Sequence, residues 1–205
     1  MRFIYRTILI IVLGIVPALS AAQETILVLG DSLSAAFGIP KQHGWVNLLQ
    51  RRLHEQRYDY RVANGSISGE TTAGGLARLT PMLNHFKPSI VIVELGVNDG
   101  LRGLSLKVMQ ENLTKIIRRV RRHHAKVLLV GMQLPPNYGL AYTSLFHSRY
   151  RKLSEQLGLP LVPFLMQGLN NDSTHFQTDD LHPTAAAQPI ILENIWQKLV
   201  PLLNK

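Results

Sequence analysis

Thr25-Ile26-Leu27-Val28-Leu29-Gly30-Asp31-Ser32 (TILVLGDS) is the stretch that decides the fold. Its first five residues form a continuous apolar run, which Gly30 ends. Residues 90–95 (IVIVEL) repeat the pattern and are followed by Gly96. Runs that are apolar on both faces are typical of strands in a buried parallel sheet. The sequence therefore predicts parallel strands that are covered on both faces.

Weaker signals extend this pattern along the chain. Further strands are expected at 126–130 (KVLLV), 159–162 (LPLV) and 60–63 (YRVA). Amphipathic patterns between the strands predict helices at roughly 43–57, 71–86, 105–124, 140–157 and 184–200. Because strands and helices alternate, we expect a three-layer α/β fold with a parallel sheet of about five strands.

Length and cysteine content narrow the class of protein. The 205 residues suffice for one ordinary domain, and no repeat or linker divides them. The chain has no cysteine. Disulfides, thiolate metal sites, a cysteine nucleophile and a lipid-modified N-terminal cysteine are therefore excluded.

The N-terminus has the layout of a secretory signal peptide. Arg2 and Arg6 precede an uncharged run that is apolar from 8 to 16 and ends in small residues up to Ala22. We expect residues 1–22 to be removed, with the mature chain beginning between positions 21 and 23, and residues 23–205 to form one periplasmic domain. A retained membrane anchor is the alternative, but the apolar stretch falls short of the ~20 residues that a spanning helix needs.

The formal charge of +9 comes from 22 Lys and Arg against 13 Asp and Glu. Much of the excess lies in the predicted helix 105–124, where apolar residues recur at helical spacing and basic residues fill the other positions. We interpret this basic cluster as the solvated face of a packed helix, with a transient contact to anionic lipid as the alternative. Nucleic-acid binding is disfavoured because no nucleic-acid motif accompanies the cluster.

Four short motifs follow predicted strands or precede predicted helices. They are 30–32 (GDS), 64–69 (NGSISG), 96–99 (GVND) and 179–183 (DDLHP). Each alone is ambiguous, because Asp, Ser and Asn are also ordinary helix-cap and turn residues. In an open α/β sheet, however, ligands bind at the carboxyl ends of the strands. The joint occurrence of the motifs at one edge of the sheet predicts a functional site there.

These four motifs, in this order, resemble those of the SGNH (GDSL) hydrolases. Residues 66–70 (SISGE), 94–103 (ELGVNDGLRG) and 134–139 (LPPNYG) are similar to the bacterial periplasmic acyl-CoA thioesterase I / lysophospholipase / arylesterase subgroup. The resemblance covers nearly the whole chain after the signal segment. It implies the flavodoxin-like SGNH-hydrolase fold and a serine hydrolase acting on ester bonds.

The resemblance also implies roles for five residues. Ser32 would be the nucleophile, His182 the base that activates it, and Asp179 the partner of that base. The oxyanion hole would be formed by the backbone N–H groups of Ser32 and Gly69 and by the side-chain amide of Asn98. Asp180 stays open as a rival of Asp179, and Ser34 is the less favoured nucleophile.

The chain departs from the subgroup at two positions. Val97 stands where glycine is usual before the Asn-Asp pair, and a β-branched residue there adds bulk and resists positive φ. Asp180 replaces a glycine that is common between the aspartate and the histidine. We expect Val97 to affect substrate range more than activity, and Asp180 to change the charge beside His182.

Two loops, 100–105 and 135–142, resemble acyl-binding loops of the subgroup. The candidate substrate contacts are Leu101, Leu104, Leu134, Tyr138 and Leu140, with Arg102 near the mouth. Ordinary loop packing is the alternative for all six.

The expected activity is hydrolysis of acyl thioesters, lysophospholipids and fatty-acyl or aryl esters. One alternative is deacetylation of a carbohydrate or cell-wall polymer, and another is an inactive cationic module that binds the envelope. No cofactor is expected, and no histidine pattern indicates a metal site. We expect a monomer whose partner is its acyl-ester or thioester substrate.

Overall fold

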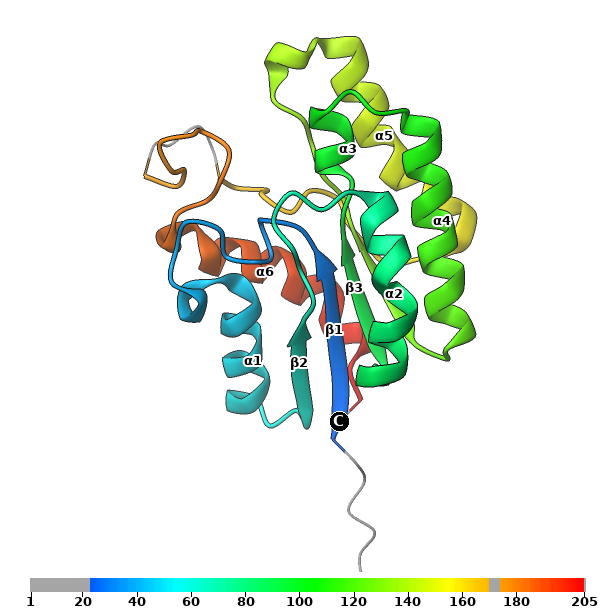
Figure 1. Cartoon of the computed structure of the whole chain (residues 1–205). Helices are drawn as coiled ribbons and strands as arrows, with labels where there is room; N and C mark the ends of the chain where they lie inside the picture. The colour runs from blue at the N-terminus through cyan, green and yellow to red at the C-terminus, as the bar shows by residue number, and fades with distance from the viewer. Residues whose placement is uncertain (1–22, 170–173, 205) are drawn as a thin grey trace, which may run out of the picture.

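The fold is a parallel five-stranded sheet with helices on both faces, as seen in a computed structural model that describes residues 23–169 and 174–204 (Figure 1). The predicted signal segment, 1–22, lies outside the described residues. The strand order is β2-β1-β3-β4-β5. The strands are β1 (Glu24–Gly30), β2 (Tyr60–Asn64), β3 (Ile90–Glu94), β4 (Lys126–Val130) and β5 (Leu161–Val162).

The two apolar runs that predicted the fold form the centre of the sheet. β1 and β3 are neighbours, with Leu27 opposite Val91 and Gly30 opposite Glu94. Every residue of β3 is buried, and in β1 only Glu24 is partly exposed. Continuous apolar strands suit this position because helices cover both faces of a parallel sheet. The predicted three-layer α/β fold is confirmed.

In the described part of the chain, six α-helices flank the sheet. They are α1 (Trp45–Glu55), α2 (Thr72–Phe86), α3 (Val97–Leu101), α4 (Leu106–Arg122), α5 (Leu140–Leu157) and α6 (Gln188–Leu199), with 3-10 turns at Lys41–His43, Pro136–Tyr138, Ala185–Ala187 and Val200–Leu202. Helices α1 and α6 pack together on one face, whereas α2 and α4 pack together on the other and α5 packs beside α4 (Figure 1). Within the described residues, no helix is long and apolar enough to cross a membrane.

Two predicted segments differ in detail. The expected loop 100–105 is partly helical, because α3 begins at Val97 directly after Gly96, which has φ 119°. Glycine adopts this left-handed backbone without strain, so the chain can turn sharply from β3 into α3. The expected strand 159–162 is shorter and comprises only Leu161–Val162.

Helix α4 confirms the interpretation of the basic cluster. Its apolar residues other than Val108 are buried, whereas Lys115, Arg118, Arg121 and Arg122 are exposed. Arg119 is half-buried and its Nη1 donates to Leu76 O and to Thr80 Oγ1 on α2. The cluster lies toward the C-terminal end of α4, far along the helix from the loop that joins it to α3.

Candidate active site

The first motif forms a tight turn at the end of β1. The Asp31 side chain accepts a hydrogen bond at Oδ1 from the Leu33 N–H, 3.1 Å away, which fixes the turn around Ser32. A Cβ atom on Gly30 would stand 2.7 Å from both Glu94 Oε2 and Ser34 Oγ. Glycine is therefore required where β1 enters the turn. The turn leaves Ser32 9% exposed, at the mouth of a cavity.

The structure brings Ser32, His182 and Asp179 together in one chain of hydrogen bonds. His182 Nε2 lies 2.9 Å from Ser32 Oγ, and His182 Nδ1 lies 2.6 Å from Asp179 Oδ2. In the tautomer that satisfies both contacts, Nδ1–H donates to the carboxylate and Nε2 accepts from the serine hydroxyl. This arrangement can remove the proton from Ser32 during a nucleophilic attack.

The loop that carries the histidine is held by local contacts. We call residues 176–183 the base loop; an isolated bridge between Phe176 and Pro183 closes it. Asp179 Oδ1 accepts from the N–H groups of Leu181 and His182, each at 3.0 Å. Burial alone would raise the pKa of Asp179, but the hydrogen bonds from His182 and Leu181 outweigh it and lower that pKa to about 2.

The geometry favours Asp179 over Asp180 as the partner of His182. The Asp180 carboxylate makes no hydrogen bond to another described residue, and its backbone has φ 55°. A glycine adopts this left-handed conformation without strain, which fits the glycine that the subgroup commonly has there. Asp180 instead lines the cavity beside His182.

Two backbone N–H groups are free to bind an oxyanion. Within residues 23–169 and 174–204, neither the N–H of Ser32 nor that of Gly69 donates a hydrogen bond. Gly69 has φ 77°, and Arg102 Nη2 holds its carbonyl at 2.8 Å.

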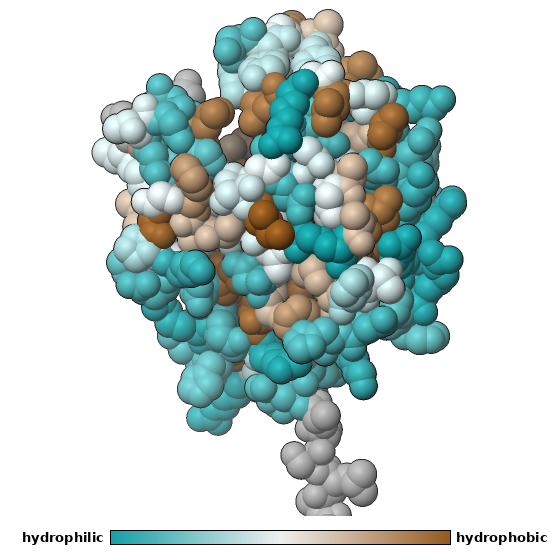
Figure 2. All heavy atoms as spheres, in the orientation of Figure 1, coloured by the Kyte–Doolittle hydropathy of each residue, from teal (hydrophilic) through white to brown (hydrophobic). Residues whose placement is uncertain are grey.

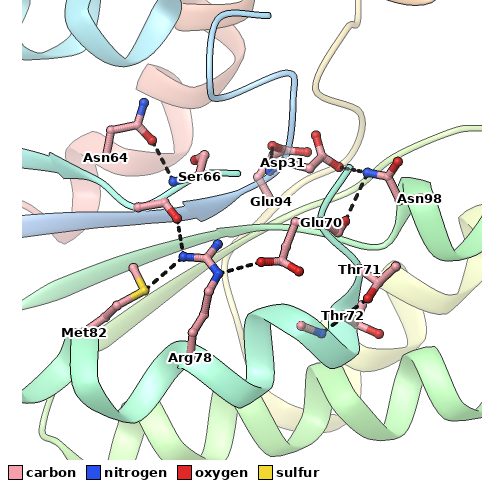
Figure 3. A network of polar contacts seen from close by, with 12 residues as sticks. Asp31, Asn64, Ser66, Glu70, Thr71, Thr72, Arg78, Met82, Glu94 and Asn98 are labelled. Carbon is pink, nitrogen blue, oxygen red and sulfur yellow. Dashed lines mark hydrogen bonds and ion pairs between the residues drawn. The ribbon is translucent and has the colours of Figure 1, made fainter. Parts of the chain in front are cut away.

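The Asn98 amide contacts the chain neighbours of both donors, Asp31 and Glu70 (Figure 3). Its Nδ2 donates to Asp31 Oδ2 and to Glu70 O, each at 3.0 Å. Asp31 precedes Ser32, and Glu70 follows Gly69. Both amide hydrogens of Asn98 thus have acceptors, so an oxyanion would share one of them in a three-centre bond.

Two buried carboxyls lie beneath the nucleophile turn. Asp31 and Glu94 are both fully buried, and Glu94 Oε2 accepts from the Asp31 N–H at 3.2 Å and from the Ser34 hydroxyl at 2.7 Å. We call Asp31, Ser34, Glu94 and Asn98 the nucleophile floor. Because its hydroxyl binds Glu94, Ser34 is not poised to attack a substrate. The sequence analysis assigned Glu94 no role.

The pKa values of both floor carboxyls are raised. Burial raises the pKa of Asp31 to about 7, although hydrogen bonds from Leu33 and Asn98 oppose the shift. Burial and the neighbouring Asp31 charge raise the pKa of Glu94 well above its usual value. Burial disfavours the charged form of both carboxyls, and the charge on Asp31 further disfavours ionisation of Glu94, so both pKa values shift upward.

A second buried contact anchors α3 and therefore Asn98. Asp99 accepts at Oδ2 from the Thr72 N–H (2.8 Å) and at Oδ1 from the Thr72 hydroxyl (2.6 Å). Asn112 Nδ2 donates to that hydroxyl oxygen at 3.2 Å. The first turns of α2 and α3 are thereby held together beneath the site.

An apolar cavity of about 350 Å³ opens beside Ser32 and His182. Two predicted contacts, Leu101 and Leu134, line it. Six further apolar residues that were not predicted as substrate contacts line its wall: Leu33, Phe164, Met166, Leu169, Phe176 and Leu181. Val97 also lines the cavity, and the positive φ of this turn lies at the preceding residue, Gly96.

The other four predicted contacts do not line this cavity. Arg102 is held against the Gly69 carbonyl, and the Tyr138 hydroxyl donates to Leu101 O at 3.2 Å. Leu104 is 46% exposed, and Leu140, at the start of α5, is 83% exposed. On the face shown in Figure 2, the upper part, near α3 and the start of α5, contains several apolar side chains, whereas the lower part is mostly hydrophilic. Within the described residues, no cluster of three or more side chains could hold a metal ion.

Comparison with known proteins places this arrangement among hydrolases. Residues 28–189 match the model of the GDSL-like Lipase/Acylhydrolase family. The chain is 51% identical to "Esterase TesA" of Pseudomonas aeruginosa over 89% of this chain and 91% of that protein. It is 39% identical to "Thioesterase 1/protease 1/lysophospholipase L1" of Escherichia coli strain K12 over 90% of this chain and 88% of that protein. A crystal structure of TesA superposes with a TM-score of 0.86 at 50% identity, over 88% of this chain and all of the other.

Proposed function

Because this chain belongs to the GDSL-like lipase/acylhydrolase family, we propose that it is a serine esterase and thioesterase. Its substrates are fatty-acyl and aryl esters, acyl thioesters and lysophospholipids. Ser32 is the nucleophile and His182 is the general base. Asp179 is the carboxylate that orients the imidazole and stabilises its positive charge. The N–H groups of Ser32 and Gly69 and the Asn98 amide form the oxyanion hole.

One observation carries this proposal: the Ser32–His182–Asp179 chain of hydrogen bonds lies at the mouth of an apolar cavity. A serine hydroxyl is a weak nucleophile at neutral pH and needs an adjacent base. The 2.9 Å contact with His182 Nε2 is within the range for direct proton transfer.

Acylation begins when Ser32 Oγ attacks the carbonyl carbon and its proton passes to His182 Nε2. The ionised Asp179 stabilises the imidazolium that forms. The oxyanion of the tetrahedral intermediate accepts hydrogen bonds from Ser32 N–H, Gly69 N–H and Asn98 Nδ2. The C–O or C–S bond then breaks, and the imidazolium gives its proton to the leaving alcohol or thiol.

Deacylation repeats these steps with water. His182 takes a proton from the water that attacks the acyl-Ser32 carbonyl, and the second tetrahedral intermediate uses the same three donors. Its collapse releases the fatty acid and returns the proton to Ser32 Oγ. Each cycle therefore consumes one water and regenerates the enzyme without a cofactor.

The cavity walls support an acyl chain as the group that binds beside Ser32. The walls are mainly Leu, Phe, Met and Val side chains, which bury methylene groups favourably. An acetylated sugar would place hydroxyl groups against these side chains, and burying unpaired hydroxyls is costly. The structure therefore favours fatty-acyl substrates over carbohydrate O-acetyl esters.

The test is a chain-length series of p-nitrophenyl esters and acyl-CoA thioesters, with Ser32→Ala and Ser34→Ala compared. We expect Ser32→Ala to lose ester hydrolysis and labelling by a fluorophosphonate probe. Ser34→Ala should still label, because its hydroxyl binds Glu94 rather than the base. Hydrolysis by Ser32→Ala at the rate of the unmodified protein would contradict the proposal. A preference for acetylated sugars would show that the substrates are carbohydrate O-acetyl esters and not fatty-acyl esters.

We also propose that the protein is exported to the periplasm and that residues 1–22 are removed there. The charged start, apolar run and small residues of this segment support the proposal. Mass spectrometry of the protein from the periplasmic fraction should give a chain that begins between positions 21 and 23. An intact N-terminus in the membrane fraction would contradict it.

A further inference from the structure

Arg78 on α2 makes contacts that neither the proposed triad nor the cavity explains. Its Nε donates to Glu70 Oε2 at 2.6 Å, and its Nη1 donates to Gly65 O and approaches Met82 Sδ at 3.1 Å. Figure 3 shows the guanidinium between Met82 and Glu70, facing the segment that joins β2 to α2. The ion pair is largely buried, with side-chain exposures of 23% for Arg78 and 12% for Glu70.

The two acceptors of Arg78 stand at opposite ends of one short loop. Gly65 directly follows β2, and Glu70 lies just before α2. Between them is Gly69, whose N–H is a proposed oxyanion donor. Glu70 itself holds the other donor group, because its carbonyl accepts from Asn98 Nδ2. One guanidinium therefore connects both ends of the loop that defines the oxyanion hole.

We propose that Arg78 is a positioning residue, a clamp that fixes Gly69 N–H and, through the Glu70 carbonyl, Asn98 Nδ2 for oxyanion binding. The inference rests on the proposed function, since it assigns Arg78 to the same oxyanion hole. A guanidinium suits this task because its donors point in several fixed directions from one plane. A lysine ammonium would reach only one end of the loop in a defined geometry.

Two glycines show how closely the clamp fits. A Cβ atom on Gly74, in the first turn of α2, would stand 1.9 Å from Glu70 Oε1. A Cβ atom on Gly65 would stand 2.0 Å from Met82 Cε. Either substitution would displace a partner of Arg78. Glycine is unfavourable within a helix, so its presence at 74 is explained by the space that Glu70 needs.

A clamp and a purely structural ion pair predict different measurements. Misplaced oxyanion donors weaken binding of the tetrahedral intermediate without weakening binding of the acyl chain, which lies among the cavity walls. The clamp therefore predicts a lower kcat and weaker binding of a tetrahedral analogue, with little change in KM. A structural ion pair predicts only a loss of thermal stability.

The chain offers a matched control in the ion pair between Arg52 Nη1 and Glu193 Oε2, at 2.8 Å. This pair joins α1 to α6 and touches no residue of the proposed site. The experiment compares Arg78→Met and Arg78→Lys with Arg52→Met and Arg52→Lys in the full chain. For each, we measure Tm, kcat and KM on a p-nitrophenyl ester, and inhibition by an alkyl trifluoromethyl ketone and by the fatty-acid product. The ketone adds to a serine hydroxyl as a tetrahedral oxyanion, whereas the product probes the cavity.

We expect Arg78→Met to lower kcat by roughly 10- to 100-fold, because small displacements of catalytic groups have effects of this size. The affinity of the enzyme for the trifluoromethyl ketone should fall by a similar factor. KM and product inhibition should change by less than about threefold, because the cavity walls that bind the acyl chain are not altered. Arg78→Lys should behave similarly, and the Arg52 variants should keep kcat and ketone affinity. If Arg78→Met does not fold, Arg78→Lys and Glu70→Gln carry the test.

Folded Arg78 variants with unchanged kcat and ketone affinity would overturn the clamp. A fall in kcat that tracks Tm equally in the Arg78 and Arg52 variants would overturn it as well. Ser32→Ala separates this failure from failure of the proposed function. If the unmodified protein shows no Ser32-dependent hydrolysis, the proposed function itself is wrong.

Discussion

The base loop and the nucleophile floor meet at Ser32, yet they are built in opposite ways. Asp179 and His182 are 39% and 21% exposed, and their contact spans three residues of sequence. Three of the four floor residues are buried and Asn98 is half-buried, and the floor contacts join residues 60 to 67 positions apart. In the proposed mechanism, an exposed local loop supplies the charge and the proton transfer, whereas the core beneath Ser32 fixes the geometry of the hydrogen-bond donors. Loss of the His182 or Asp179 side chain should affect mainly the rate, whereas changes in the floor should affect rate, stability and pH dependence together.

The largest effect is expected in the base loop. His182→Ala should lower kcat/KM by about 10⁵-fold or more, because no other described group lies within hydrogen-bond distance of Ser32 Oγ to act as its base. Tm should change by less than about 3 °C, since the ring is partly exposed and makes few core contacts. Stopped-flow or long-incubation assays and calorimetry measure the two quantities. A large loss of Tm would show that the base loop is part of the folded core after all.

Asp179→Asn and Asp180→Asn form a matched pair within the same loop. Asp179→Asn should cost on the order of 10⁴ in kcat, because the amide cannot hold the productive tautomer of His182 or stabilise its charge. Asp180→Asn should change kcat by less than about threefold, because the Asp180 carboxylate does not contact His182. Equal losses in both variants would contradict the assignment of Asp179.

Asn98→Ala tests the floor with a smaller effect on rate. It should lower kcat by roughly 10²- to 10³-fold, as for other oxyanion-hole donors. It also removes a hydrogen bond to buried Asp31, so Tm should fall, unlike in His182→Ala. Measuring kcat and Tm in the same preparation checks both parts. An unchanged Tm would argue against the coupling of activity and stability in the floor.

Glu94→Gln tests the pH dependence of the floor. Because the pKa values of Asp31 and Glu94 are raised in the folded state, the native protein binds more protons than the unfolded chain above pH ~4. Stability should therefore fall as pH rises from about 4 to about 7 and beyond. Glutamine can keep both hydrogen bonds that Glu94 accepts and cannot ionise, so the fall should become shallower.

At pH 8 we expect Glu94→Gln to exceed the unmodified protein in free energy of unfolding by about 1–3 kcal/mol. Near pH 4 the two should be similar. Urea unfolding at pH 4, 6 and 8 measures the slope. Identical slopes for the two proteins would show that the floor carboxyls do not set it.

The smallest effect is expected at Asp180. Its φ of 55° is strained for a residue with a side chain, and Asp180→Gly should raise the free energy of unfolding by a few tenths of a kcal/mol to about 1 kcal/mol. The rate should hardly change. Thermal unfolding measures the gain, with Asp180→Ala as the control that keeps a Cβ atom. A gain for Asp180→Ala equal to that for Asp180→Gly would show that charge, rather than backbone strain, is relieved.

The parts of the site that were predictable from the sequence are those that follow buried strands. Ser32 and Asn98 stand directly after continuous apolar runs, where the edge of a parallel sheet is expected. The family resemblance then indicated which residues to expect around them. Helix α3 was not foreseen, because Gly96 and Asn98-Asp99 have the composition of a turn. Its helical form depends on Thr72, which is distant in sequence.

The cavity and the clamp were harder to predict for a physical reason. Phe164, Met166 and Phe176 come from the irregular segment after β5, where no periodicity shows which side chains turn inward. Arg78 lies on an amphipathic helix, and an arginine there is ordinarily a solvated residue. Only the position of the β2–α2 loop shows that its guanidinium faces Glu70 and Gly65. Interactions between distant segments thus account for most of what sequence patterns did not indicate.

The contact between Ser32 and His182 joins residues 150 positions apart, and among the described elements only α6 and the 3-10 turns on either side of it follow the histidine. Helix α6 packs on α1, and its first residue, Gln188, accepts from the Trp45 N–H at 3.0 Å. A nascent chain that stops before residue 182 therefore lacks the proposed base of Ser32. Molecules cut before His182 would keep Ser32 without its proposed base, so hydrolysis by the proposed triad would report that the segment from β1 to His182 is intact and folded.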